Sequence, residues 1–226
     1  MSIEFTATAR RLGVYSSAAT AVLLAAYAVT LAVGLVSLES PDHPISDPMF
    51  SILEVLIIVM MPAMVVMMAA VHAWTPRQLK ALSLVSVIFM GLLAGLTCSL
   101  HFVVLTLSRH PVFTEQPWLP LVMSFRWPSI VYSLDILGWD IFFAFSMLFA
   151  APVFSGNRLA AWVRVAMITS GMLSLAGLIG VAAGDMQVRN IGILGYVGAF
   201  LITCILLAIL FHRTVPAVSQ DNGRIS

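Results

Sequence analysis

The stretch from Met49 to Trp74 reads MFSILEVLIIVMMPAMVVMMAAVHAW and carries one acid, Glu54, and no lysine or arginine. About 20 apolar residues in a helix, rising about 1.5 Å each, cross the hydrocarbon core of a membrane. Five other stretches share this character, so the predicted spans are about 14–37, 49–74, 80–107, 129–153, 160–183 and 191–212. The sequence therefore predicts an all-α integral membrane protein, a bundle of about six transmembrane helices in a single domain over 1–226.

The composition points to the same environment. Of the 226 residues, 61% are hydrophobic and only 9% are charged, whereas a soluble domain carries about 25% charged residues. So few charges do not cover a surface that faces water, and we expect membrane lipid as the main surrounding. The formal net charge of +1 provides no field that would attract nucleic acid, so nucleic acid is not an expected partner.

The distribution of basic residues predicts the orientation. With the N-terminus in the cytoplasm, the inner side holds Arg10, Arg11, Arg77, Lys80, Arg158, Arg164, Arg213 and Arg224. The outer side then holds Arg109, Arg126 and Arg189, together with Glu39, Asp42, Asp47, Glu115 and Asp185. Cytoplasmic loops carry the excess of Lys and Arg, so we expect both termini inside, with a bacterial cytoplasmic membrane as the location. The first apolar run exceeds the 7–15 residues typical of a signal peptide, so it is expected to stay as an anchor.

Small and flexible residues mark how the helices pack. The fifth and sixth spans are rich in glycine, and Gly180 and Gly184 form a GxxxG pair that is typical of close helix contacts in membranes. We expect these contacts within the chain. The second span contains several methionines around Pro62, which is expected to kink it. Methionine adapts to irregular space, so Met61 is predicted to line the wall of a cavity for a lipophilic ligand.

Four ionisable residues inside the spans are the strongest functional signal, because such residues are costly in lipid and usually mark function. Glu54, His101 and Asp135 come from three spans. By helical rise they lie at one level, roughly 8–10 Å below the outer boundary. Asp140 lies deeper, roughly 17 Å down. We take Asp135, Asp140, Glu54 and His101 as candidate catalytic residues.

The fourth span places aromatic groups beside these acids. Tyr132, Asp135 and Trp139 form one stripe on the helix, while Asp140 lies about 140° around from Asp135. One acid is therefore expected to face a pocket and the other to pair with a neighbouring helix. The candidate substrate-binding residues are Tyr132, Trp139, Phe143, Trp127, Met61 and Cys98.

A buried acid beside an imidazole is a proton donor–acceptor pair, and aromatic faces stabilise positive charge. The sequence therefore favours an outward-side pocket for a small lipophilic molecule, with acid–base isomerisation, cyclisation or lyase chemistry on an isoprenoid-like substrate. A proton-coupled small-molecule transporter or channel needs the same groups and is one alternative. The other is an accessory subunit, with glycine-rich helices as contacts in a homo-oligomer or a larger membrane complex.

A purely structural role for the polar groups also remains open. Asp135 is able to bond Arg126 or Tyr132. Arg126 and Arg189, near the mouth of the predicted pocket, are suited to bind an anionic head group, but we expect them to pair with Asp185 and Glu115 instead. No lysine lies in the interior of a span for a retinal Schiff base, no span holds a histidine pair for haem, and the chain has no zinc-hydrolase motif. We therefore expect no cofactor and no metal.

Overall fold

The computed structural model describes residues 5–38 and 45–216, and within these the chain is helical, with no strand. Six helical segments are long and apolar enough to cross a membrane: Ala7–Val36, Met49–Trp74, Arg77–Leu107, Ile130–Val153, Arg158–Ala183 and Met186–Arg213. The predicted bundle of six spanning helices is confirmed, and the chain is an integral membrane protein by this architecture. Glu39, Asp42 and Arg224, which enter the predicted charge distribution, lie outside the described residues.

Three of the spans are single helices and three are built from shorter elements. The single ones are α1 (Ala7–Val36), α2 (Met49–Trp74) and α8 (Arg158–Ala183). The third span consists of η1 (Arg77–Leu79) and α3 (Lys80–Leu107). The fourth consists of α6 (Ile130–Ile136), η2 (Leu137–Phe142), α7 (Phe143–Ala150) and η3 (Ala151–Val153). The sixth consists of α9 (Met186–Arg189), α10 (Ile191–Ile193), η4 (Leu194–Ala199) and α11 (Phe200–Arg213).

Hydrogen-bonding side chains fix where several spans begin. Thr6 caps α1 by accepting from Ala9 N, Ser129 caps α6 through Tyr132 N, and Asn157 caps α8 through Ala160 N. Such caps satisfy backbone N–H groups that have no partner in the first turn. The first span consequently starts at residue 7, earlier than the predicted start near 14.

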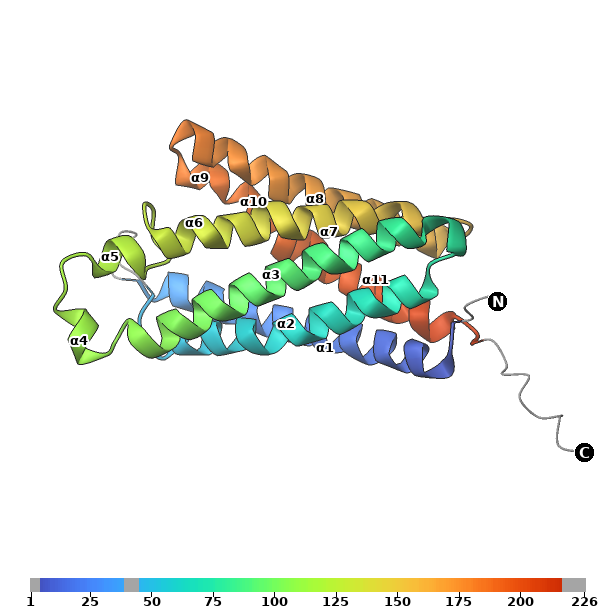
Figure 1. Ribbon diagram of the computed structural model, residues 1–226, viewed down its shortest axis with the longest axis horizontal. Coiled ribbons are helices and arrows are strands. Elements are labelled where there is room, and N and C mark those ends of the chain that lie inside the picture. The colour runs from blue at the N-terminus through green and yellow to red at the C-terminus, as the bar shows by residue number, and fades with distance from the viewer. Residues whose placement is uncertain (1–4, 39–44, 217–226) are drawn as a thin grey trace, which may run out of the picture.

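The spans form a ring in chain order. α1 packs against α2, α2 against α3, α3 against α7, α7 against α8 and α8 against α11, and α11 closes the ring on α1. Figure 1 shows the spans running lengthwise, with α4 (Pro111–Thr114) and α5 (Leu119–Val122) at one end. We call this the α4–α5 end. The start of α1 and the end of α11 lie at the opposite end, the terminal end (Figure 1).

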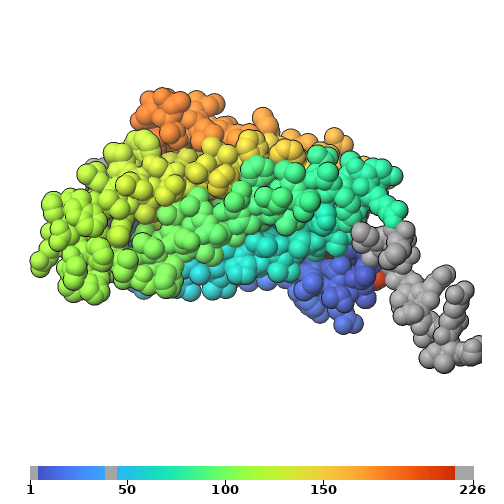
Figure 2. All heavy atoms as spheres, viewed as in Figure 1, coloured from blue at the N-terminus to red at the C-terminus, as the bar shows by residue number. Residues whose placement is uncertain are grey.

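Apolar side chains fill the interior of the ring toward the terminal end. The largest fully buried ones include Met60, Met61, Met64, Met67, Met68, Phe143, Phe154, Phe200 and Phe211. Large apolar side chains also face outward along five of the spans, as expected where lipid is the solvent, whereas the fourth span exposes only Ile130 at its start. On the face that Figure 2 shows, side chains of α2, α3 and α7 cover the middle of the bundle.

Glycines bring the fifth and sixth spans close together. A Cβ on Gly177 or Gly180 of α8 would collide with the backbone at Arg189, and a Cβ on Gly195 would collide with that at Ser170. Ser170 Oγ donates to Gly195 O at 2.8 Å across the same contact. These contacts lie within the chain. Gly184 does not share in them: at φ 70° it ends α8 in the left-handed conformation, so the predicted GxxxG pair is wrong in its second member.

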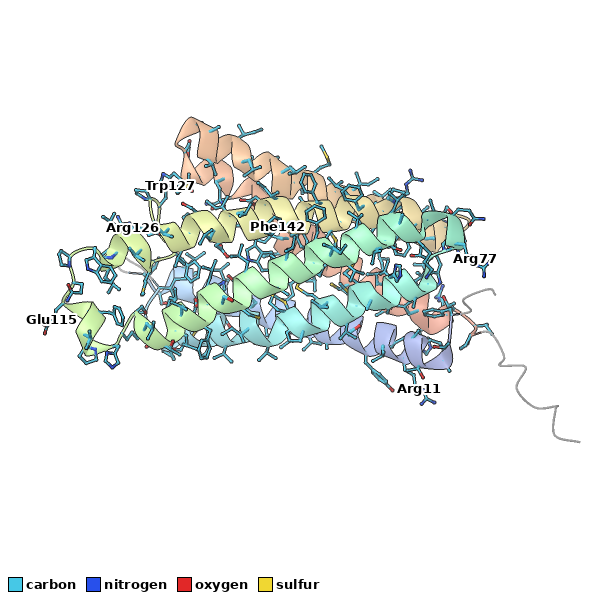
Figure 3. All side chains as sticks on the ribbon, in the orientation of Figure 1. Arg11, Arg77, Glu115, Arg126, Trp127 and Phe142 are labelled. Carbon is cyan, nitrogen blue, oxygen red and sulfur yellow. The ribbon has the colours of Figure 1, made fainter. Side chains whose placement is uncertain are left out.

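The two ends of the bundle differ in charge. Arg10 of α1 donates to the carbonyls of Phe211 and His212 at the end of α11, and Lys80 donates to the carbonyl of His72 near the end of α2. Cations at helix C-termini complement the partial negative charge there. Figure 3 shows Arg11 and Arg77 at this terminal end, whereas Glu115, Arg126 and Trp127 lie at the α4–α5 end.

Candidate functional site

A cavity of about 830 Å³ occupies the interior of the ring at the α4–α5 end. Its wall is formed by α1, α2, α3, α5, α6, η2, α9, α10 and η4, so all but the fifth span contribute to it. Most of the lining is apolar, but Glu54, His101, Asp135 and Arg189 also face it. Ligand sites commonly have this size and this mixture of apolar wall and few polar groups.

The first polar group of the cavity is a row formed by Glu54, His101 and Asp135. His101 Nδ1 lies 2.8 Å from Glu54 Oε2, within hydrogen-bond distance, and His101 Nε2 lies 3.6 Å from Asp135 Oδ1. The Phe125 ring stacks on the imidazole with centroids 4.5 Å apart. His101 Nε2 and Asp135 Oδ1 have no hydrogen-bond partner among the described residues. The row thus has one hydrogen-bonded end and one looser end, where two buried polar atoms face each other without a hydrogen bond.

The spans bring this row together at a single depth. Glu54 lies near the start of α2, His101 near the end of α3 and Asp135 near the end of α6. α3 packs against both α2 and α6, which places its imidazole between the two acids. The depth estimated from helical rise had predicted this common level, and the structure brings the three side chains into contact.

The second polar group is a buried ion pair between Asp140 and Arg189. Arg189 Nε donates to Asp140 Oδ2 at 3.3 Å, and the two residues are 3% and 0% exposed, respectively. The guanidinium carbon lies 5.1 Å from the centre of the Tyr132 ring and 5.8 Å from that of Tyr196. The expectation that Arg189 pairs with Asp185 or Glu115 is wrong, because Asp185 instead caps α9 through Gln187 N.

The floor of the cavity lies between two π-helical turns. η2 contributes Trp139 and η4 contributes Tyr196, whose ring centroids lie 5.1 Å apart. Asp140 is also in η2 but pairs with Arg189, whereas Asp135 contacts His101, so the two acids of the fourth span face different neighbours. Asp135 lines the cavity and Asp140 does not, as their angular separation had suggested. Single π-turns within α-helices occur frequently at functional sites.

Comparison with protein-family models, curated protein sequences and solved structures gives no match to this chain. The assignment of a function therefore depends on the geometry of the site. Among the described residues, no group of three His, Cys, Asp or Glu side chains is arranged to hold a metal ion. Only Glu54 forms a hydrogen bond with His101 there, so no serine or cysteine is positioned beside the imidazole as a nucleophile.

The six predicted substrate-binding residues divide into two groups. Tyr132 and Trp139 line the cavity. The others do not: Phe143 is buried beneath the floor against Phe200, and Met61 is buried in the core, while its neighbour Met60 lines the wall instead. Cys98 lies 3.8 Å from the carbonyl of Ile58, and Trp127 is 37% exposed in the segment before α6.

Two tyrosines of the cavity, Tyr27 and Tyr196, were not predicted, and Arg189 was predicted near the pocket mouth but outside a span. Tyr27 of α1 lies in a helix with no marked polar face, so nothing distinguished it. Tyr196 lies within an apolar run, where nothing distinguished it either, whereas Arg189 precedes the predicted start of its span at 191 although the helical segment begins at Met186. Arg189 stands between Gly184 and Gly192 in the sequence, and these glycines were the available indication that its backbone approaches a neighbouring segment closely.

A second set of charges lies at the mouth of the cavity. Arg109 lines it, pairs with Asp47, and lies 4.5 Å from the centre of the Phe50 ring. Hydrogen bonds from Ser51 and then from Arg109 hold the pKa of the Asp47 carboxyl below its ordinary value. Arg126 also lines the cavity and has no ion-pair partner among the described residues. Among the described residues that line the mouth, the charged side chains are therefore basic.

Proposed function

We propose that the protein is a membrane-embedded acid–base enzyme. It catalyses an isomerisation, a cyclisation or a lyase-type elimination reaction on a small lipophilic molecule held in the cavity. The observation that carries this proposal is the row of Glu54, His101 and Asp135, in which an imidazole lies between two carboxyl groups at a cavity wall. A positioned acid or base of this kind contributes about 10²–10⁴-fold to a reaction that moves a proton.

Each member of the row has a distinct role in this proposal. Glu54 accepts a hydrogen bond from Nδ1–H of His101 and so orients the ring with Nε2 toward Asp135. His101 and Asp135 are the groups that exchange protons with the ligand, because Nε2 and Oδ1 have no other partner in the described part of the chain. Isomerisation, cyclisation and elimination each require one proton delivered and one removed. They consume no water and need no covalent intermediate with the protein.

The wall of the cavity supports a lipophilic ligand. Tyr27, Tyr132, Trp139 and Tyr196 line the cavity together with the acids, and aliphatic side chains of α1 and α2 also line it. Aromatic faces attract cations and so favour positive charge that develops when a ligand is protonated. The alternative of a transporter shares the proton-exchanging row but needs a path through the terminal half, where the methionines and phenylalanines are fully buried.

The proposal is tested by exchange of hydrogen with solvent. Purified protein is held in heavy water, its lipophilic ligands are extracted, and their masses are measured. An acid–base enzyme introduces deuterium at the carbon that it protonates, so the wild-type protein should enrich one extracted molecule. Asp135→Asn should abolish the enrichment. Glu115→Gln, which removes an exposed carboxyl group outside the cavity, is the matched control and should leave it intact.

Three other outcomes would redirect the assignment. Enrichment that is equal in wild type and Asp135→Asn would refute an acid–base role for the row. Flux of a small molecule or of protons into liposomes, without deuterium incorporation, would favour the transporter. Stable co-purification with a partner protein, with no effect of Asp135→Asn, would favour an accessory subunit.

We further infer that the terminal end faces the cytoplasm of a bacterial cell, which places the cavity on the outer side. The basic side chains gathered at that end support this orientation. In a variant whose own two cysteines are replaced, an impermeant thiol reagent applied to intact cells should label Glu115→Cys and leave Arg77→Cys unlabelled. The reverse pattern would refute the orientation.

A further inference from the structure

A guanidinium group in the cavity wall has an unused edge. Arg189 lines the cavity although the residue is only 3% exposed. Its Nε donates to Asp140, whereas Nη2 is buried without a hydrogen-bond partner among the described residues. A buried donor that stays unpaired is unfavourable, so the edge formed by Nη1 and Nη2 is a site that a ligand acceptor would stabilise.

The surroundings hold this edge in a fixed direction. Asp140 fixes the guanidinium at Nε, and the rings of Tyr132 and Tyr196 lie 5.1 and 5.8 Å from its central carbon. Gly180 and Gly192 allow the backbone of this segment to approach α8 and Asp140 closely. A planar guanidinium with a free edge matches two oxygens of a carboxylate or phosphate in one plane. The features together resemble a prepared anion site more than a structural ion pair.

We propose that the cavity takes a lipophile with an anionic head group, a carboxylate or a phosphate, whose oxygens accept hydrogen bonds from the Nη1–Nη2 edge of Arg189. The apolar chain lies against Leu24, Leu31, Leu53 and Ile57, which line the same cavity. This inference rests on the proposed function because it takes the cavity as the ligand site. Binding of the anionic head group at Arg189 does not, however, require that a reaction takes place.

The charges around the cavity are compatible with an anion. Arg126 and Arg109 lie at the mouth, and Arg126 has no acidic partner in the described part of the chain. The two acids of the wall, Glu54 and Asp135, both lie at His101, so a protonated imidazole offsets one of their two negative charges. An entering anion therefore passes basic side chains before it reaches Arg189.

The experiment compares four amphiphiles of the same chain length: laurate, dodecyl phosphate, dodecanol and dodecylamine. Each is titrated into the protein in a non-ionic detergent below its own micelle concentration, and the melting temperature is followed. Laurate or dodecyl phosphate should raise it in a saturable manner, and dodecanol and dodecylamine should not. Which of the two anions acts identifies the head group, and didodecanoyl phosphatidate distinguishes a single-chain ligand from a membrane lipid.

Variants then locate the site. Arg189→Gln should abolish the shift, and Arg189→Lys, which keeps the charge without the planar edge, should weaken apparent binding by about tenfold or more. Arg11→Gln removes an exposed cation at the terminal end and should change nothing. If Arg189→Gln fails to fold, the four-ligand comparison on wild-type protein still decides.

The outcomes separate this inference from the proposed function. Equal stabilisation by dodecanol or dodecylamine, or an unchanged shift in Arg189→Gln, would overturn the anion site. Anion binding without deuterium incorporation into any ligand would keep the site and refute the enzyme. Deuterium incorporation into a neutral lipophile would keep the enzyme and refute the anionic substrate.

Discussion

Gly180→Ala tests the packing that brings Arg189 to its place. A Cβ at this position would lie 2.2 Å from Arg189 N, 2.5 Å from Asp185 O and 2.7 Å from Arg189 Cα. Ordinary contact begins near 3.4 Å, so α9 must move by roughly 1 Å. All three neighbours are backbone atoms, which cannot rotate away. Overpacking costs about 1–3 kcal/mol, and we expect the upper end, about 3 kcal/mol, or about a 100-fold change in the unfolding equilibrium.

The assay is reversible unfolding of the purified protein in mixed micelles with increasing sodium dodecyl sulfate, followed by tryptophan fluorescence. Gly95→Ala is the matched control, since a Cβ on this exposed α3 glycine meets nothing within 4 Å. It should be neutral or stabilising by at most about 1 kcal/mol. Gly180→Ala should also weaken the laurate or dodecyl phosphate shift. Equal stability of the two variants would refute the close approach of α8 and α9.

Three further predictions concern other contacts in the structure. Asp140→Asn should destabilise the protein by about 3 kcal/mol in the micelle assay, because its buried guanidinium partner loses the compensating charge; a loss below about 1 kcal/mol would contradict a buried ion pair. Ser86→Ala removes a hydroxyl that donates at 2.7 Å between α3 and α7, and its cost should be only about 0.6 kcal/mol. Hydrogen bonds from Ser51 and Arg109 lower the pKa of Asp47, so this contact stabilises the fold above the ordinary pKa of 3.8 and is lost as pH falls below it. The melting temperature of the wild type should therefore fall more steeply on acidification than that of Asp47→Asn, and parallel curves would contradict the contact.

Most of the fold was predictable because a membrane imposes a length on each apolar run. The helices α2, α3 and α8, expected at 49–74, 80–107 and 160–183, were predicted to within two residues at each end. Axial position follows from the constant rise of a helix, and for that reason the common level of Glu54, His101 and Asp135 could be estimated. The lateral neighbours of a helix have no such rule, so the contact of these residues needed the structure.

The residues whose predicted positions differ from the structure each have a local explanation. Phe143 was expected in the pocket because it follows Trp139 by one turn, but that turn carries it below the cavity floor against Tyr196 and Phe200. Arg189 was assigned to a loop because the apolar run begins only at 191, whereas the Asp185 cap starts the helix earlier. A pair such as Asp140 and Arg189, 49 positions apart, leaves no pattern in one sequence.

Counting the buried charges connects the two proposals. The interior holds three carboxyl groups, Glu54, Asp135 and Asp140, against two groups that can be cationic, His101 and Arg189. Each uncompensated ion in such surroundings costs several kcal/mol, on the order of the stability of a whole domain. With His101 and Arg189 both cationic, this group still carries one negative charge in excess, and an anionic head group at Arg189 would add a second. Under both proposals, binding of the anion therefore favours uptake of a proton from solution by the site, and the row at His101 is where a proton would be delivered to the ligand and taken back.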